Sequence, residues 1–178
     1  MIYILIGCFI FLVFMDQISK SVAVQLLGSI GAKCEFIHNI LRLEYRENTG
    51  MAWGLLKDAR VFFIIITILL CGLVLFFMIK QRRNMPKLIS LSLSIILAGA
   101  VGNFIDRVFL GYVRDFLAFD FFDFPVFNLA DSYVTIGAAM LIILLFFTKQ
   151  GKAFIKHLES EDNARIERRK DRKKNNAE

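Results

Sequence analysis

Residues 61–79 read VFFIIITILLCGLVLFFMI, and the next eight residues, KQRRNMPK (80–87), are rich in positive charge. A membrane-spanning helix needs about 20 mostly apolar residues, so residues 61–79 are predicted to cross a membrane. Residues 88–105, LISLSLSIILAGAVGNFI, form a second apolar run, and Pro86 suits the beginning of its helix. This stretch therefore predicts a hairpin of two membrane helices joined by a short basic loop.

Two further apolar runs, at residues 2–27 and 129–147, flank the hairpin. Apolar residues make up 57% of the 178 residues, 19 residues are Phe, and the mean hydropathy is +0.59. This composition is typical of a polytopic membrane protein rather than of a soluble domain. We therefore predict a membrane all-α fold with four transmembrane helices, at about 2–27, 61–79, 88–105 and 129–147, in a domain of residues 1–148 followed by a basic tail, 149–178.

Positive charge is distributed unevenly between the two sides that these spans define. The loop at 80–87 carries four Lys or Arg residues and the segment after Phe147 carries ten, whereas the two longer connections and the helix ends beside them carry eight. Basic residues favour the cytoplasmic side of a membrane, so the loop, the tail and both termini are predicted to be cytoplasmic. The net charge of +6 thus reflects membrane anchoring, and no nucleic acid partner is predicted.

The two connections on the other side have sequences that indicate structure. Residues 41–46 alternate apolar and polar side chains, which predicts a half-buried strand, and residues 48–50 predict a turn after it. Residues 107–128 combine seven Phe with three Asp residues. Aromatic rings beside charges favour a segment that lies at the outer membrane interface.

Polar residues gather at the outer ends of the predicted spans. An ionisable group at membrane depth costs about 2.5–3.5 kcal/mol on insertion scales, so such residues need a structural or functional reason. Asp16 and Lys20 are four residues apart, hence on one helical face, and are predicted to form a structural ion pair. The other residues of this group are Asn48, Gly50, Trp53, Asn103, Asp106, Arg107, Asn128 and Asp131.

Asp106 and Asp131 lie at adjacent ends of two predicted helices, where they can face each other. Each also has a structural interpretation, Asp106 as a helix-end charge and Asp131 as an acidic residue in the first turn of a helix that Asn128 caps. Two carboxylates held close together share a proton. The ionised one can take a proton from water while the protonated one hydrogen-bonds the scissile carbonyl. The pair therefore predicts peptide hydrolysis without a metal.

Other catalytic schemes find little support in the sequence. His38 and His157 fall on opposite sides of the membrane in the predicted topology, so neither partners a nucleophilic Ser. The sequence contains no zinc-protease, nucleophile-elbow or phosphate-binding motif. The three cysteines lack metal-binding spacing. We therefore predict no metal site and no cofactor.

Short motifs stand in order between Asp16 and Asp131. They are Asp16-Gln-Ile-Ser-Lys20, Asn48-Thr-Gly-Met-Ala-Trp53, Gly102-Asn-Phe-Ile-Asp-Arg107, Val113-Arg-Asp-Phe116 and Phe127-Asn-Leu-Ala-Asp131. Together they resemble the motifs of the lipoprotein signal peptidase family, also called signal peptidase II. The resemblance covers nearly the whole chain to Thr148, which makes it specific.

The resemblance implies an aspartic endopeptidase that cleaves bacterial prolipoproteins just before a diacylglyceryl-modified cysteine and is blocked by globomycin. It implies a monomer in the inner (cytoplasmic) membrane, in contact with phospholipid, with the active site at the periplasmic face beside a small β-sheet that cradles the substrate. Asp106 and Asp131 are expected to be catalytic. Substrate-binding or site-shaping residues are expected to be Asn48, Gly50, Asn103, Arg107, Asn128 and Ala130, and structural polar residues Asp16, Lys20, Trp53 and Asp115.

Two other classes of protein stay open at this point. A small transporter or ion-pathway subunit uses ionisable residues as a relay, but here they cluster at one surface and no inverted repeat is visible. A membrane scaffold that acts through its basic tail leaves the outer polar cluster without a role. Cleavage of a diacylglyceryl prolipoprotein by the purified protein distinguishes a peptidase from both.

Overall fold

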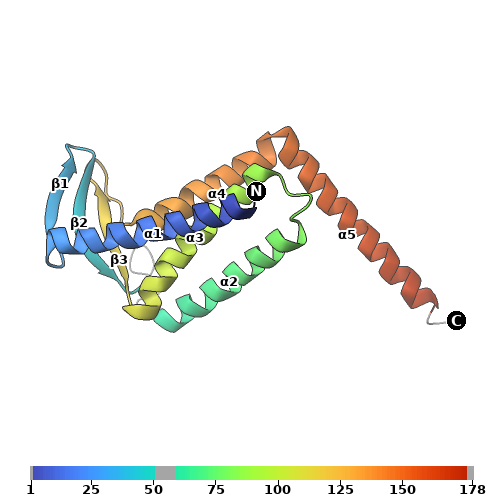
Figure 1. The fold of residues 1–178 in the computed structure, drawn as a ribbon, viewed down its shortest axis with the longest axis horizontal. Coiled ribbons are helices and arrows are strands. Elements are labelled where there is room, and N and C mark those ends of the chain that lie inside the picture. Colours follow the sequence, from blue (N-terminus) through green and yellow to red (C-terminus); the bar gives the residue numbers. More distant parts are fainter. Residues whose placement is uncertain (1, 51–58, 176–178) are drawn as a thin grey trace.

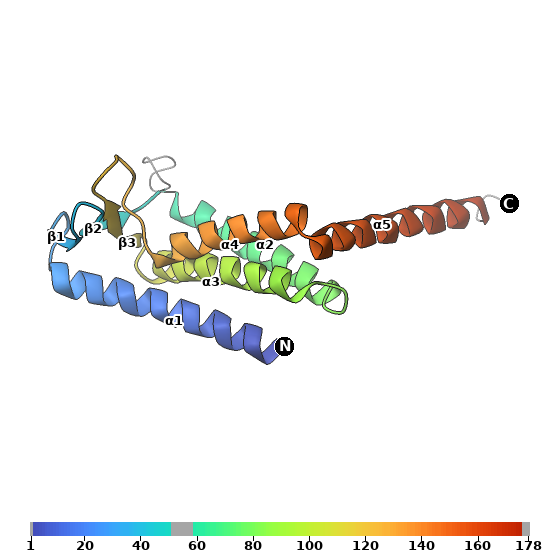
Figure 2. The same ribbon diagram turned by 90° about the horizontal axis from the view of Figure 1, so that it is seen from above.

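The computed structural model describes residues 2–50 and 59–175. In this part of the chain the helices α1 to α4 run side by side, with the strands at one end of the bundle and α5 leaving from the other (Figure 1, Figure 2). We call these the sheet end and the loop end. The elements are α1 (Ile2–Leu27), β1 (Lys33–Ile37), β2 (Leu41–Asn48), α2 (Arg60–Lys80), α3 (Lys87–Phe109), β3 (Val113–Phe119), α4 (Leu129–Phe147) and α5 (Lys149–Asn175).

Among the described residues, α1, α2, α3 and α4 are each long and apolar enough to span a membrane. This confirms the four predicted spans, and the chain is a multi-pass membrane protein. Large apolar side chains on α1 and α2 are exposed, as lipid-facing residues of a membrane bundle must be. They include Ile10, Phe11, Phe14, Ile65, Leu69 and Phe76.

Helix α3 packs against α1, α2 and α4 and forms the centre of the bundle. Small residues allow the close approach: a Cβ at Gly99 would overlap the carbonyl oxygen of Ala130, and one at Gly102 would lie 2.5 Å from Asp16 Oδ2. In lipid no hydrophobic force draws helices together, so close packing of backbones at small residues takes its place. This packing holds the beginning of α4 against both α1 and α3.

Within the described residues the strands form an antiparallel sheet in the order β1-β2-β3. The strand predicted at 41–46 is present as β2, which continues to Asn48. By contrast, residues 113–119, predicted as part of an interfacial segment, form β3 and pair with β2. The sequence did not indicate this strand because its second and third residues, Arg114 and Asp115, are charged, and Asp is uncommon in strands.

A tight turn returns the chain from α3 to the sheet. Gly111 has φ +92°, a conformation that glycine adopts without a steric penalty. Phe116 and Leu117 of β3 then pack with Ala23 of α1 in one buried cluster. The turn and this cluster hold β3 across the sheet end of the bundle, close to the ends of α1 and α3.

Candidate active site

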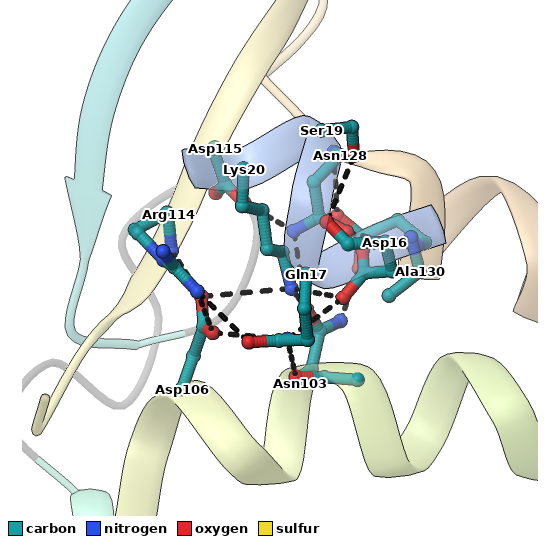
Figure 3. A network of polar contacts seen from close by, with 12 residues as sticks. Asp16, Gln17, Ser19, Lys20, Asn103, Asp106, Arg114, Asp115, Asn128 and Ala130 are labelled. Atoms are coloured by element: carbon teal, nitrogen blue, oxygen red, sulfur yellow. Dashed lines mark hydrogen bonds and ion pairs between the residues drawn. The ribbon is translucent and has the colours of Figure 1, made fainter. Parts of the chain in front are cut away.

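Buried charges meet at the sheet end of the bundle, where α1, α3 and the start of α4 lie beneath β3 (Figure 3). The side chains of Asp16, Lys20 and Asp106 are 0% exposed. Lys20 Nζ lies 2.9 Å from Asp16 Oδ2 and 3.5 Å from Asp106 Oδ2. It also donates to Asn103 Oδ1 at 3.0 Å. The predicted ion pair of Asp16 and Lys20 is therefore present, and the same ammonium group also serves Asp106.

Arg114 of β3 supplies a second cation to Asp106. Its side chain donates to the carboxylate through Nε at 3.2 Å and Nη2 at 2.8 Å, and its backbone N–H donates at 3.0 Å. The same guanidinium donates to Gln17 Oε1 at 2.9 Å, and Gln17 Nε2 donates to Asp106 at 3.2 Å. Charge-assisted, bidentate hydrogen bonds of this kind are strong and directional. They neutralise Asp106 and tie β3 to α1 and α3.

The first turn of α4 is held from two sides. The Asn128 side chain accepts from the Asp131 N–H at 3.1 Å, and Asp131 Oδ2 accepts from the Asn128 N–H at 3.1 Å, which is a capping box. From α1, Asp16 Oδ1 accepts from the Ala130 N–H at 2.9 Å. Ala130 is 0% exposed, so it shapes this region through its N–H and its packing.

Asp115 follows Arg114 in β3, and its side chain projects to the other face of the strand. It is 2% exposed and accepts hydrogen bonds from Asn48 Nδ2 at 2.9 Å and from Asn128 Nδ2 at 2.6 Å. Burial, and after it the negative charge of Asp131, raises the pKa of Asp115 to about 7. This carboxyl is therefore able to hold or release a proton near neutral pH.

Asp131 is the carboxylate whose charge acts on Asp115. It is only partly buried and accepts a hydrogen bond from Asn103 Nδ2 at 2.7 Å. Asn128 contacts both carboxylates, since its side-chain N–H bonds Asp115 and its backbone N–H bonds Asp131.

Gly50, which follows β2, and Arg107 of α3 complete the surroundings of the acidic site. Gly50 N–H donates to Asn48 Oδ1 at 3.0 Å, which orients the amide that bonds Asp115. The carbonyl of Gly50 accepts from Arg107 Nη2 at 3.3 Å. Arg107 also lies over the Phe63 ring, with Cζ 4.7 Å from its centroid. Its guanidinium is near enough to interact with the charge of Asp131.

The structure gathers the polar residues that the sequence singles out, but it associates the carboxylates differently. From the sequence, Asp106 pairs with Asp131. In the described contacts Asp106 is instead bound to Lys20 and Arg114, whereas Asp115 and Asp131 are linked through Asn128, which bonds both. The reason is the position of β3. This strand places Asp115 over the start of α4, and the neighbouring residue in the strand, Arg114, binds the Asp106 carboxylate.

Two further residues from the sequence prediction need separate description. Trp53, predicted as a structural polar residue, lies outside the described residues. The sequence predicts a structural role for Asp115, although its alternation with Val113 and Leu117, which are also buried in β3, is a signal for an inward-facing position. Across residues 2–50 and 59–175, no three His, Cys, Asp or Glu side chains are arranged to hold a metal ion.

Membrane spans that hold buried carboxylates beneath a small sheet define the class of this chain, a multi-pass membrane protein with an enzyme-like acidic site. The sequence profile of signal peptidase (SPase) II matches residues 8–147. The chain belongs to the signal peptidase II family, and it is therefore a membrane-bound protease.

The relatives cover most of the chain. Over 155 residues it is 44% identical to the lipoprotein signal peptidase of Enterococcus faecalis, covering 85% of this chain and 94% of that protein. Over 137 residues it is 44% identical to the lipoprotein signal peptidase of Caldanaerobacter subterraneus subsp. tengcongensis, covering 77% and 92%. A solved bacterial membrane enzyme, determined by the in meso method at 2.3 Å resolution, is 38% identical with a TM-score of 0.76, covering 82% of this chain and 88% of that one.

Proposed function

We propose that this chain removes the signal peptides of bacterial prolipoproteins by hydrolysis, with Asp115 and Asp131 as an aspartic dyad. The observation that carries the proposal is that Asn128 bonds both carboxylates, with its side-chain N–H on the buried Asp115 and its backbone N–H on Asp131. In agreement with this arrangement, burial and then the charge of Asp131 raise the pKa of Asp115 to about 7. Two coupled carboxylates that share one proton supply an acid and a base together. The substrate class is supported by the relatives, which are named lipoprotein signal peptidases.

In the proposed mechanism Asp115 carries the shared proton near neutral pH and Asp131 carries the negative charge. Asp131 takes a proton from water, the water oxygen attacks the scissile carbonyl, and Asp115 gives its proton to the carbonyl oxygen. The product of this step is a neutral tetrahedral diol. Asp131 then protonates the leaving amine while Asp115 takes a proton from one diol hydroxyl. The C–N bond breaks, and the dyad returns to its starting protonation.

Asp106, predicted from the sequence to be catalytic, has contacts that favour a positioning role. Lys20 and Arg114 already neutralise it, so it lacks a free site for a water molecule or a substrate carbonyl among the described groups around it. We propose that Asp106 holds the strand that presents Asp115. Asn128 orients the Asp115 carboxyl from the side of α4.

The placement in the membrane is part of the proposal. The basic loop at 80–87, the beginning of α1 and the beginning of α5 lie at the loop end, and α5 extends from there away from the sheet (Figure 1). Because basic residues favour the cytoplasmic side, we place the loop end in the cytoplasm and the dyad at the outer face of the inner membrane. Residues 1–148 then form the peptidase domain, which we propose acts as a monomer surrounded by phospholipid.

Lipidation of the substrate is expected to speed its cleavage by placing the scissile bond at the depth of the active site. Acyl chains that stay in the bilayer gain almost nothing on binding, but they fix the depth of the scissile bond. Purified protein in lipid discs is expected to cut a diacylglyceryl-modified precursor at least about 100-fold faster than the unmodified one, since small misplacements cost about that factor. Mass spectrometry of the products checks the cut before the modified cysteine.

Two controls accompany this assay. Asp131→Asn protein reveals any contaminating protease, and globomycin is expected to stop the cleavage that depends on the dyad. Equal cleavage of both precursors contradicts lipid-dependent presentation and indicates a general membrane protease.

The pH dependence of cleavage is expected to report the shared proton. Asp115 is protonated below its pKa of about 7 and loses that proton above it. Because the mechanism needs one proton on the dyad, kcat/KM is expected to fall as the pH rises through about 7. A pH series of kcat/KM in discs measures this limb. A kcat/KM that stays constant well into the alkaline range excludes Asp115 as the proton carrier.

A further inference from the structure

The corner between α4 and α5 is fixed by local contacts. Thr148 Oγ1 donates to the Leu144 carbonyl at 2.6 Å and accepts from the Gly151 N–H at 3.0 Å. A Cβ at position 151 would overlap the same carbonyl, so only glycine permits this close turn. Helix α5 therefore leaves in a set direction, across the loop end rather than along the spans (Figure 1).

One face of α5 packs against the loop end. Gln81 Nε2 donates to Glu161 Oε2 at 2.8 Å, and Asn84 Nδ2 lies 2.9 Å from His157 Nε2. These contacts determine which side of α5 is turned toward the bundle. The apolar part of the contact is a buried cluster of Met85, Ile89, Leu93 and Phe154.

The same face of α5 continues beyond the bundle as a row of exposed arginines, which we call the arginine stripe. Its members are at i, i+3, i+4 and i+7 and line one open concavity. Arg172 comes 18 residues after the packed Phe154, about five full turns of 3.6 residues, so the stripe shares the face that packs on the bundle. The stripe consists of Arg165, Arg168, Arg169 and Arg172.

We propose that the arginine stripe binds the anionic headgroups of the membrane in which the protein is embedded. The face of α5 that is turned toward the bundle is also turned toward the lipid around it. Guanidinium groups bind phosphate in a bidentate geometry, through two parallel N–H donors. Exposed Arg82 and Arg83 in the loop extend the positive surface at the same end.

Hydrogen exchange of the full-length protein tests this proposal. The protein is placed in discs of phosphatidylcholine alone or mixed with phosphatidylglycerol, and the amides of residues 162–175 are followed. Exchange is expected to be at least about tenfold slower in the anionic discs, and added salt is expected to reverse the effect by screening. A triple variant with Arg165→Gln, Arg168→Gln and Arg172→Gln is expected to exchange equally fast in both discs.

A charge-matched variant makes the test specific for the face. Lys152→Gln, Lys156→Gln and Lys170→Gln remove three charges from the opposite side of α5 and are expected to keep the protection. Equal exchange of the unmodified protein in both discs overturns the proposal, and so does equal loss of protection in the lysine variant. Protection by inorganic phosphate in neutral discs also overturns it, because the occupant is then a free anion rather than the membrane.

Discussion

Asp115→Asn and Asp131→Asn are each expected to lower prolipoprotein cleavage by about 10²–10⁴-fold or more, because asparagine keeps the shape of the side chain but cannot carry the shared proton. Asp106→Asn is expected to act differently. It weakens the contacts to Lys20 and Arg114 that hold β3, so it lowers the yield and stability while its folded fraction still cleaves. The measurement is kcat/KM in lipid discs, normalised to folded protein.

A carboxylate near the site but outside it provides the control. Asp120 pairs with Arg42 at 2.6 Å on the sheet surface, where such a pair contributes about 0–1 kcal/mol. Asp120→Asn is expected to keep the activity of the unmodified protein. If Asp115→Asn cleaves normally while folded Asp106→Asn does not, the dyad is Asp106 and Asp131, as the sequence predicts, rather than Asp115 and Asp131.

Lys20→Met is expected to lower the free energy of unfolding by about 3–5 kcal/mol, the usual cost of removing one partner from a buried ion pair. The substitution keeps a long unbranched side chain but removes the cation that lies beside the carboxylates of Asp16 and Asp106. Both carboxylates are 0% exposed, so water cannot replace the lost charge. Unfolding of the purified protein in detergent, followed by heat or denaturant, measures the change.

An exposed lysine on the sheet supplies the comparison. Lys33 is 56% exposed and lies 3.4 Å from Glu44, and Lys33→Met is expected to change the stability by about 0–1 kcal/mol. Equal unfolding midpoints for the two variants show that the buried pair contributes no more than a surface pair. In that case the buried ion pairs of Lys20 are not a major source of the stability of the bundle.

The features that sequence predicts well here are those with a local signal. The spans follow from long apolar runs, the pair of Asp16 and Lys20 from its spacing within one helix, and β2 from its alternation. The strand β3 has a weaker local signal, because Arg114 and Asp115 occupy positions where a strand usually has apolar or β-branched residues.

The choice of carboxylate pair depends on contacts between distant segments. Asp106 and Asp131 both lie at helix ends, and adjacent helix ends suggest a pair. The proposed pairing of Asp115 with Asp131 through Asn128 depends on the turn at Gly111 and on the contact of Arg114 with Asp106. No single segment carries that information, so the motifs indicate which residues gather at the site but do not determine which of them interact.

The long-range hydrogen bond from Ala130 to Asp16 has a consequence for how the chain is made. Residue 130 leaves the ribosome more than a hundred residues after residue 16, so α1 enters the membrane long before its final partner exists. During that interval Lys20, four residues away in the same helix, can neutralise Asp16 and reduce the cost of about 2.5–3.5 kcal/mol for inserting a charged residue. The ion pair thus serves Asp16 during membrane insertion as well as in the folded protein, and Asp16 completes its bonding only when α4 is synthesised. A protease whose parts meet in that order stays inactive until the whole bundle has assembled.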